Sequence, residues 1–272
     1  MRRDTILLLA GLLAAITPPW GFHAEAADLD CLIEPRMVVS VAPAVEGLLE
    51  SVLVDRGDVV RQGQVLATLE SSVERATVAS SKFRSEMEAA LKSNQVRVEY
   101  GGRKAERTGQ VYKEGGISIK DVDEAETEKL LAEIGVLEAR ENRRLAELEL
   151  ARATEALGLR TIRSPLNGVV VQRFLAPGEF AKQVPILKLA QIDPLYVEVI
   201  APVALIGKIQ VGRTAEVRPE APMTGAYQAR VIVVDQVVDA ASGTFGIRLE
   251  LPNPENRLPA GLKCKVRFPS LR

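Results

Sequence analysis

The chain of 272 residues is 47% hydrophobic and 26% charged, which is typical of a soluble globular protein and excludes a disordered one. Its 35 basic and 36 acidic residues leave a formal net charge of -1, so no overall field attracts nucleic acid or an anionic membrane surface. We therefore expect partners that are recognised by shape, and no nucleic acid among them.

Residues 1–26 have the pattern of a secretory signal peptide. Two arginines precede an apolar run from Ile6 to Ile16, which is shorter than the roughly 20 residues that a membrane-spanning helix needs. Ala24 and Ala26 form a small-x-small cleavage motif, so we predict cleavage before Ala27. An uncleaved N-terminal anchor is the alternative.

The mature chain has no histidine, because His23 lies within the predicted signal peptide. This removes the commonest metal ligand and most pairs of a nucleophile with a base. The chain also has no glycine-rich phosphate-binding loop. We therefore predict no catalytic residue, no bound metal and no cofactor, and the protein is not expected to be an enzyme.

Two short segments of the chain repeat one another at an offset of 121 residues. The first is "APAVEGLLESVLVDRGDVVRQGQVLATL" and the second is "SPLNGVVVQRFLAPGEFAKQVPILKLA". Each reads as a small hairpin sheet with too little apolar surface to fold alone, so we predict that the two pack face to face as a β-sandwich. The repeat aligns four glycines, which are expected to need positive φ or a close backbone approach: Gly47, Gly57, Gly168 and Gly178.

The segment between the two repeats, 71–160, has no proline and is rich in helix-forming residues. Gly115 and Gly116 divide it into two predicted helices of about 40 residues, each on the order of 60 Å long. The spacing of apolar residues predicts a coiled-coil face formed by Leu130, Ile134, Leu137, Leu145 and Leu148.

Capping motifs mark the ends of the two predicted helices. Ser71 to Glu74 and Ser118 to Asp121 each match a capping box at the start of a helix, and Gly158 suits a helix end. The turn between the helices is expected around the paired glycines.

From Asp193 onward, short alternating strands separated by turn residues predict a small β-barrel, which the early strand "CLIEPRMVVSV" would complete. In the last strand, Cys264 falls on the apolar face and is expected to point into the core. Cys31 is the only other cysteine. In an oxidising compartment the two are predicted to form a disulfide, and two buried thiols are the alternative.

The order of these segments resembles the membrane fusion protein (HlyD-like) family, the periplasmic adaptors of tripartite efflux pumps and secretion systems. The resemblance covers nearly all of the mature chain and rests on "APAVEG", "RGDVVRQGQVLATLES", "IRSPLNGVV", "PGEF" and "VVDAASGTFGIRLELPNPENRLPAGLKCKV". It implies an elongated fold of mixed α and β class. The expected parts are an antiparallel β-barrel (27–42 and 192–272), a split lipoyl- or biotinyl-like β-sandwich (43–70 and 161–191) and a long antiparallel α-helical coiled-coil hairpin inserted between its halves (71–160).

The resemblance implies a periplasmic adaptor that forms a ring, with six subunits expected, between an inner-membrane transporter and an outer-membrane channel. A resistance-nodulation-division (RND) transporter is the first choice, and an ABC-type exporter or a type I secretion system is the alternative. The barrel and "ELPNPENRLPAG" are expected to face the transporter. The transported substrate is not indicated.

The sequence disfavours two other classes of protein. A biotin or lipoyl carrier would place its modified lysine near Val73, where this chain has none, so a carrier role is disfavoured. A metal-binding adaptor or chaperone is disfavoured because the mature chain lacks histidine and its methionines are not clustered.

At the tip of the hairpin, the family resemblance implies an arginine, a leucine and a serine that dock on the outer-membrane channel. Arg107, Val111 and Ser118 stand at the corresponding spacing, and valine in place of leucine is a departure from the pattern. Solvated helix surface for Arg107 and simple helix capping for Ser118 are the alternative interpretations.

Overall fold

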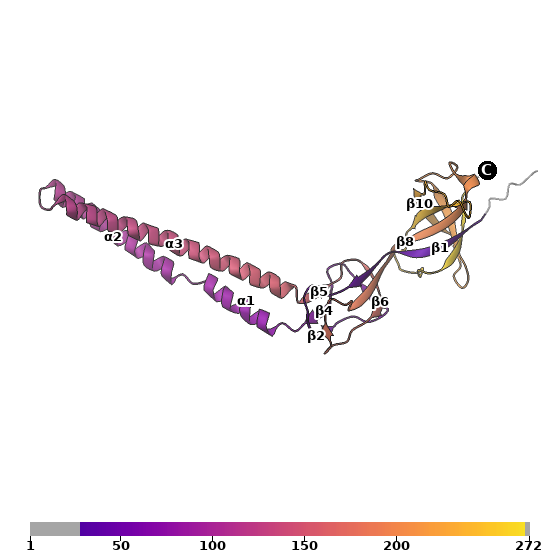
Figure 1. Cartoon of the computed structure of the whole chain (residues 1–272), viewed down its shortest axis with the longest axis horizontal. Coiled ribbons are helices and arrows are strands. Elements are labelled where there is room, and N and C mark those ends of the chain that lie inside the picture. The colour runs from indigo at the N-terminus through magenta and orange to yellow at the C-terminus, as the bar shows by residue number, and fades with distance from the viewer. Residues whose placement is uncertain (1–27, 270–272) are drawn as a thin grey trace, which may run out of the picture. The chain divides into compact units, whose positions relative to one another are not determined.

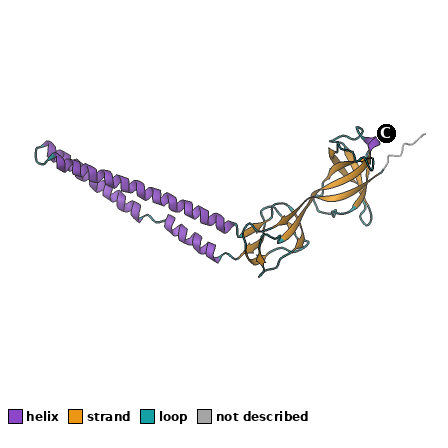
Figure 2. Ribbon diagram, viewed as in Figure 1, coloured by secondary structure: helices purple, strands orange, loops and turns teal. Residues whose placement is uncertain are grey.

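A computed structural model describes residues 28–269, so the predicted signal peptide and its cleavage before Ala27 lie outside the described residues. The described chain is of mixed α and β class with a β-barrel and a long helix, as predicted (Figures 1 and 2). It divides into two compact units. Of the described residues, the barrel unit comprises 28–34, Tyr196–Pro252 and 261–269, and the sandwich unit comprises Pro35–Leu195 and Asn253–Ala260. The finer domain boundaries stay a prediction.

The strands of the barrel unit follow the order β1-β12-β9-β10-β11-β8, and an additional pairing of β1 with β8 completes the circuit. Buried and exposed residues alternate along them, and Val217, Leu249 and Val266 are fully buried. The bounds are β1 Leu29–Val41, β8 Leu187–Pro202, β9 Thr214–Pro219, β10 Tyr227–Val234, β11 Thr244–Leu251 and β12 Lys263–Arg267, with a short 3-10 helix, η1, at Val203–Leu205.

The two cysteines lie opposite one another in the antiparallel pairing of β1 with β12, and the structure joins them as a disulfide. Cys264 is 1% exposed and points into the core, as its place on the apolar face of the strand predicts. The bond links two strands that are far apart in the sequence and adjacent in the sheet.

The two repeats form the sandwich by exchanging strands. β2 of the first repeat pairs with β7 of the second, and β3 of the first pairs with β6 of the second. The bounds are β2 Gly47–Val52, β3 Val59–Val60, β4 Val65–Leu69, β5 Thr161–Arg163, β6 Gly168–Arg173 and β7 Phe180–Ala181.

Hydrogen bonds at the two glycine turns follow the same reciprocal pattern. The Gly57 N–H donates to the Val170 carbonyl at 2.9 Å, and the Gly178 N–H donates to the Leu49 carbonyl at 2.8 Å. These bonds are equivalent under the 121-residue offset, which confirms the internal repeat. Gly57 and Gly178 have φ of +95° and +90°, a region that favours glycine.

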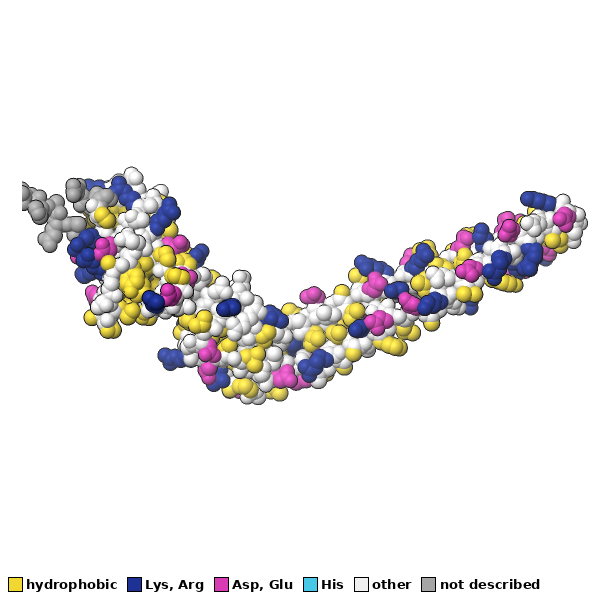
Figure 3. Space-filling view, turned by 180° about the vertical axis from the view of Figure 1, so that it is seen from behind, with side chains coloured by type: hydrophobic (Ala, Val, Ile, Leu, Met, Phe, Trp, Pro, Cys, Tyr) yellow, Lys and Arg dark blue, Asp and Glu magenta, His cyan; other side chains and the backbone are white. Residues whose placement is uncertain are grey.

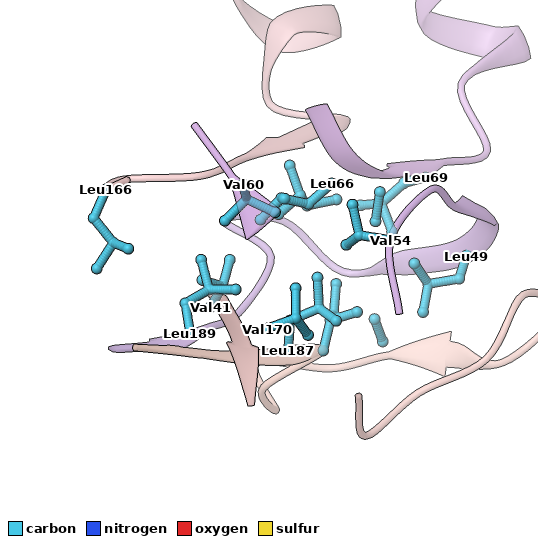
Figure 4. Packing of buried hydrophobic residues seen from close by; sticks show 14 residues of the cluster. Val41, Leu49, Val54, Val60, Leu66, Leu69, Leu166, Val170, Leu187 and Leu189 are labelled. Atoms are coloured by element: carbon cyan, nitrogen blue, oxygen red, sulfur yellow. The ribbon is translucent and has the colours of Figure 1, made fainter. Parts of the chain in front are cut away.

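One hydrophobic core lies between the two halves (Figure 4). Leu49, Leu66 and Leu69 come from the first half, and Leu187 and Leu189 come from the second. All five are at most 1% exposed, and burial of each such side chain contributes about 2 kcal/mol. Because each half supplies about one side of this core, the sandwich requires both.

The helical segment is inserted between β4 and β5, which pair with each other. Three helices form it, α1 (Ser72–Ser85), α2 (Ala89–Lys113) and α3 (Ile119–Gly158), so the prediction of two helices is wrong. α1 ends without glycine or proline. The Ser85 hydroxyl donates to the Lys82 carbonyl at 2.8 Å, and such local bonds compete with the helical pattern. α1 and α2 then pack separately against α3.

The face of α3 that packs against the other helices is not the predicted one. Its buried residues are the alanines Ala125, Ala139 and Ala153, whereas the predicted coiled-coil residues, from Leu130 to Leu148, are between 44 and 57% exposed. The cause is the short distance between the helices. A Cβ on Gly101 of α2 would lie 3.1 Å from the Lys129 Cα of α3, which leaves no space for leucine. Coiled-coil winding of these helices stays a prediction.

A clamp joins the helices to the sandwich at the root of the hairpin. The Arg160 guanidinium pairs with Glu74 of α1 at 2.5 Å and donates to the Glu46 carbonyl at 3.1 Å. The predicted capping box at Ser71 to Glu74 is therefore not formed, because Glu74 binds Arg160 and the Ser71 hydroxyl accepts a bond from Arg75 instead. A Cβ on Gly47 would meet the same Arg160 guanidinium at 2.7 Å.

We predict that Gly168→Ala destabilises the sandwich. A Cβ at this position would lie 2.1 Å from the Ala190 carbonyl oxygen of the neighbouring strand, which is backbone and must shift. We expect the free energy of unfolding to fall by about 3 kcal/mol, measured by urea denaturation. Gly109→Ala is the matched control, because nothing lies within 4 Å of its Cβ and α2 should keep or gain stability. Equal stability of the two variants would contradict the packing described.

Candidate functional site

The tip of the hairpin is a tight turn between α2 and α3. The Gly115 N–H donates to the Tyr112 carbonyl at 2.9 Å, and the Gly116 N–H donates to the Val111 carbonyl at 3.0 Å. Gly115 has φ of +78°, and a Cβ on Gly116 would meet the Val111 side chain at 2.8 Å. The predicted turn at these two glycines is confirmed, and it holds Val111 at the end of α2.

Ser118 and Asp121 cap the start of α3. The Ser118 hydroxyl and backbone N–H both donate to Asp121 Oδ2, at 2.7 and 3.0 Å. These bonds stabilise the carboxylate, first the hydroxyl and then the N–H, and together with the charge of Lys120 they lower the pKa of Asp121 below its ordinary value of 3.8. The cap predicted at Ser118 is therefore built around a charged Asp121.

The structure brings Arg107 and Val111 together at one surface groove of about 370 Å³ beside the turn. Val111 is 37% exposed. Ser118 does not line the groove and reaches it only through Asp121, which does. The groove is lined by Lys104, Arg107, Thr108, Val111, Ile117, Asp121, Glu124 and Ala125.

Sequence reasoning missed the other members of this groove. Lys104 pairs with Glu128 of α3 at 2.5 Å, which raises the pKa of Lys104 and ties the two helices together near the tip. Thr108 and Ile117 complete the lining between Arg107 and the turn. The one available signal was the apolar character of Ile117 directly after the two glycines. The groove can receive a side chain of a partner, with a cation, a carboxylate and an apolar wall within reach.

Two features are absent from residues 28–269, the part of the chain that the structure describes. No helix in this range has the length and apolar content needed to cross a membrane. No group of three or more His, Cys, Asp or Glu side chains in the same range is arranged to hold a metal ion.

Two family models match the chain in the order of its parts. The model of the CzcB-like barrel-sandwich hybrid domain matches residues 37–190, and the model of the CusB-like beta-barrel domain matches residues 194–271. The chain belongs to the CzcB-like membrane fusion protein family. The resemblance noted in the sequence is thereby confirmed.

Curated relatives of this family member are efflux proteins. It is 25% identical over 228 residues to the cobalt-zinc-cadmium resistance protein CzcB of Cupriavidus metallidurans, covering 83% of this chain and 41% of the relative. It is 27% identical over 248 residues to the macrolide export protein MacA of Yersinia pestis, covering 84% of this chain and 63% of the relative. The chain thus spans less than two thirds of the length of these relatives.

Solved structures share the fold of this family member. The crystal structure of MacA from Actinobacillus actinomycetemcomitans matches with a TM-score of 0.73 at 21% identity, covering 89% of this chain and 78% of that one. The membrane fusion protein Spr0693 from Streptococcus pneumoniae matches with a TM-score of 0.58 at 15% identity, covering 89% and 97%.

We predict that Ser118→Ala raises the pKa of Asp121 toward 3.8, because the variant loses the hydroxyl that stabilises the carboxylate. A lowered pKa means that the cap stabilises the start of α3 above pH 3.8 and is lost as the pH falls through the lowered value. Side-chain carboxyl NMR of the folded protein measures the shift. Ser80→Ala on α1 is the control and should leave Asp121 unchanged. An Asp121 that titrates at the same pH in all three proteins would contradict the cap.

Proposed function

We propose that this protein is a non-enzymatic periplasmic adaptor that forms a ring and bridges an inner-membrane efflux transporter to an outer-membrane channel. The ring, expected to contain six copies, would seal an export conduit between the two membranes. An RND transporter is the proposed inner-membrane partner. Export to the periplasm by the N-terminal signal peptide, followed by cleavage, belongs to the same proposal.

The insertion of the helices into the β4–β5 turn is the observation that carries this proposal. α3 has 40 residues, so it extends on the order of 60 Å at 1.5 Å per residue. Its start is at a groove that the family resemblance assigns to channel docking, and its end is clamped to the sandwich through Arg160. A long arm that is clamped at one end and has a groove at the other suits contact with a distant partner.

The named functions of the relatives support export and differ in what is exported. One is a cobalt-zinc-cadmium resistance protein, one is a toluene efflux pump periplasmic linker protein and one is a macrolide export protein. We therefore propose a role that does not depend on cargo recognition by this chain. An ABC-type exporter is the alternative transporter.

A carrier role is disfavoured by the same insertion. In a lipoyl or biotinyl carrier the modified lysine would stand in the turn after β4, and in this chain the helices leave the sandwich at that point. Val73, at the expected lysine position, is the second residue of α1 and is exposed. The turn that a carrier needs is absent from the described residues.

Within this proposal, Arg107 and Val111 contact the channel directly, and Ser118 positions Asp121 at the edge of the groove. The four aligned glycines hold the sandwich that supports the arm. The disulfide between Cys31 and Cys264 holds the barrel closed at the strand β1.

We predict that a photo-reactive residue in place of Val111 captures an outer-membrane channel protein in cells. Val111 lines the tip groove and its side chain is part-exposed, so a bound partner lies within reach. Mass spectrometry of the captured band identifies the partner.

The same residue placed at Lys82 is the matched control. Lys82 is 64% exposed on α1, far along the hairpin from the tip, and should capture no channel. Capture of nothing at Val111 by a folded periplasmic protein, or equal capture at both positions, would contradict channel docking at the tip.

A further inference from the structure

One end of the barrel unit carries several exposed aliphatic side chains. β1 leaves the barrel unit after Glu34 and β8 enters it at Tyr196, so Leu29 and Pro202, at the other ends of these strands, lie at the opposite end of the barrel. Figure 3 shows hydrophobic side chains at the surface of the barrel unit, among charged ones. We name the exposed aliphatic residues at this end the barrel-end patch: Ile200, Val203, Ile206, Val211 and Val237. Their side chains are between 46 and 82% exposed.

Backbone hydrogen bonds bring the segments that carry this patch together. The Val203 N–H donates to the Gly243 carbonyl at 2.9 Å, which ties η1 to the loop between β10 and β11. Val237 lies in that loop. The Gly212 N–H donates to a carbonyl of β10 at 2.8 Å, so the preceding Val211 lies beside the same strand. The patch is therefore formed by three segments that meet at one end of the barrel.

The segment between η1 and β9 separates its apolar side chains into two groups. Ile209 is 4% exposed and packs into the barrel, whereas Ile206 and Val211, on either side of it, are 46 and 64% exposed. Val237, at 82%, is the most exposed of the large hydrophobic residues that the structure describes. Exposed aliphatic side chains are unfavourable in water, and a group of them at one place marks a surface that becomes covered.

The chemistry of the patch suits a lipid surface. All five side chains are aliphatic, whereas the residues that dominate binding between proteins are tryptophan, tyrosine and arginine. The charged residues of the segments 200–213 and 235–243 are two basic and two acidic ones, Lys208, Arg213, Asp235 and Asp239. These charges balance, so the patch would enter the boundary between headgroups and acyl chains through apolar burial and not through attraction to anionic lipids.

The position of the patch in the chain also favours a membrane as its partner. The described chain begins at Asp28, directly before β1, and the apolar run of the predicted signal peptide ends at Ile16, a short stretch earlier in the sequence. Until cleavage, a signal peptide holds the start of the exported chain at the inner membrane. The end of the barrel that carries the patch is thus the part of the fold nearest to that membrane during export.

We infer that the barrel-end patch binds the lipid surface of the inner membrane, with its aliphatic side chains inserted at the level of the headgroups. The contact keeps the barrel at the membrane after the signal peptide has been removed. It needs no transporter, so it goes beyond the adaptor function proposed above.

A single tryptophan placed in the patch tests this contact. Trp20, the only tryptophan of the chain, lies in the predicted signal peptide, so the mature chain has none. Residues 27–272 are produced behind an unrelated cleavable leader with Val237→Trp. Leu53→Trp in the sandwich unit is the matched control, because Leu53 is also an exposed aliphatic residue, at 61%.

We expect vesicles of phosphatidylethanolamine and phosphatidylglycerol to shift the fluorescence of the Val237→Trp protein to shorter wavelength. Brominated acyl chains should quench it. The fluorescence of the Leu53→Trp protein should stay unchanged in both measurements.

Vesicle flotation measures how much the patch contributes to binding. Val211→Ser combined with Val237→Ser should weaken binding about tenfold, because two aliphatic side chains no longer leave water. Leu53→Ser combined with Val59→Ser is the control and should bind as the unaltered protein does. All four positions are between 61 and 82% exposed, so both variants should fold, which circular dichroism checks. Raised salt, or vesicles of phosphatidylcholine alone, should leave binding unchanged.

Four outcomes would overturn the inference. They are no flotation of the unaltered protein, equal binding of the two double variants, loss of binding in raised salt, and binding only to native inner-membrane vesicles, which contain transporters. None of them bears on the capture of a channel at Val111, so the two proposals fail separately.

Discussion

The exchange of strands between the two repeats is the constraint on which the sandwich unit depends. Hydrogen bonds run from each glycine turn to the opposite half, at Gly57 to Val170 and at Gly178 to Leu49. Each half lacks strands that the other supplies. The second repeat must therefore pair with the first, whatever segment lies between them. The helices can therefore be inserted at the β4–β5 turn, since the sandwich joins both of their ends.

Small and large apolar residues occupy different faces of the helices in the hairpin. Small residues, the alanines of α3 together with Gly101 and Gly135, let the helices approach closely and hold the arm together. The five larger side chains from Leu130 to Leu148 lie outside this seam and are between 44 and 57% exposed. The same division separates the residues that join the helices from the apolar side chains that remain exposed. The packed face therefore holds the hairpin together, and the proposed docking groove lies at its tip.

Much of the fold could be predicted from the sequence because glycines and prolines mark its turns. The repeat followed from the aligned glycines, and the hairpin followed from a long stretch without proline between them. The break after Ser85 could not be predicted, because no glycine or proline marks it. The packing face of α3 was also assigned wrongly. Alanines at 125, 139 and 153 and the exposed leucines have compatible helical spacings, and hydrophobicity alone favours leucine. Only the distance between the helices decides between the two faces.

The tip site was accessible to sequence reasoning in part. The family pattern pointed to Arg107, Val111 and Ser118, whereas the roles of Lys104, Thr108 and Ile117 depend on how the turn folds the end of α2 onto the start of α3. The cap formed by Ser118 and Asp121 could be predicted from the sequence. The position of Asp121 at the groove could not, because it depends on the fold of the turn.

Replacement of residues 70–160 by an Asn-Gly turn tests the central claim most directly, because the claim is that the hairpin is a docking arm inserted into a sandwich that folds by itself. Affinity purification of this shortened protein from cells, with identification of its partners by mass spectrometry, is the measurement. The account predicts a folded periplasmic protein that still copurifies with an inner-membrane RND transporter and no longer copurifies with an outer-membrane channel. A shortened protein that fails to fold, or one that retains the channel, would contradict it.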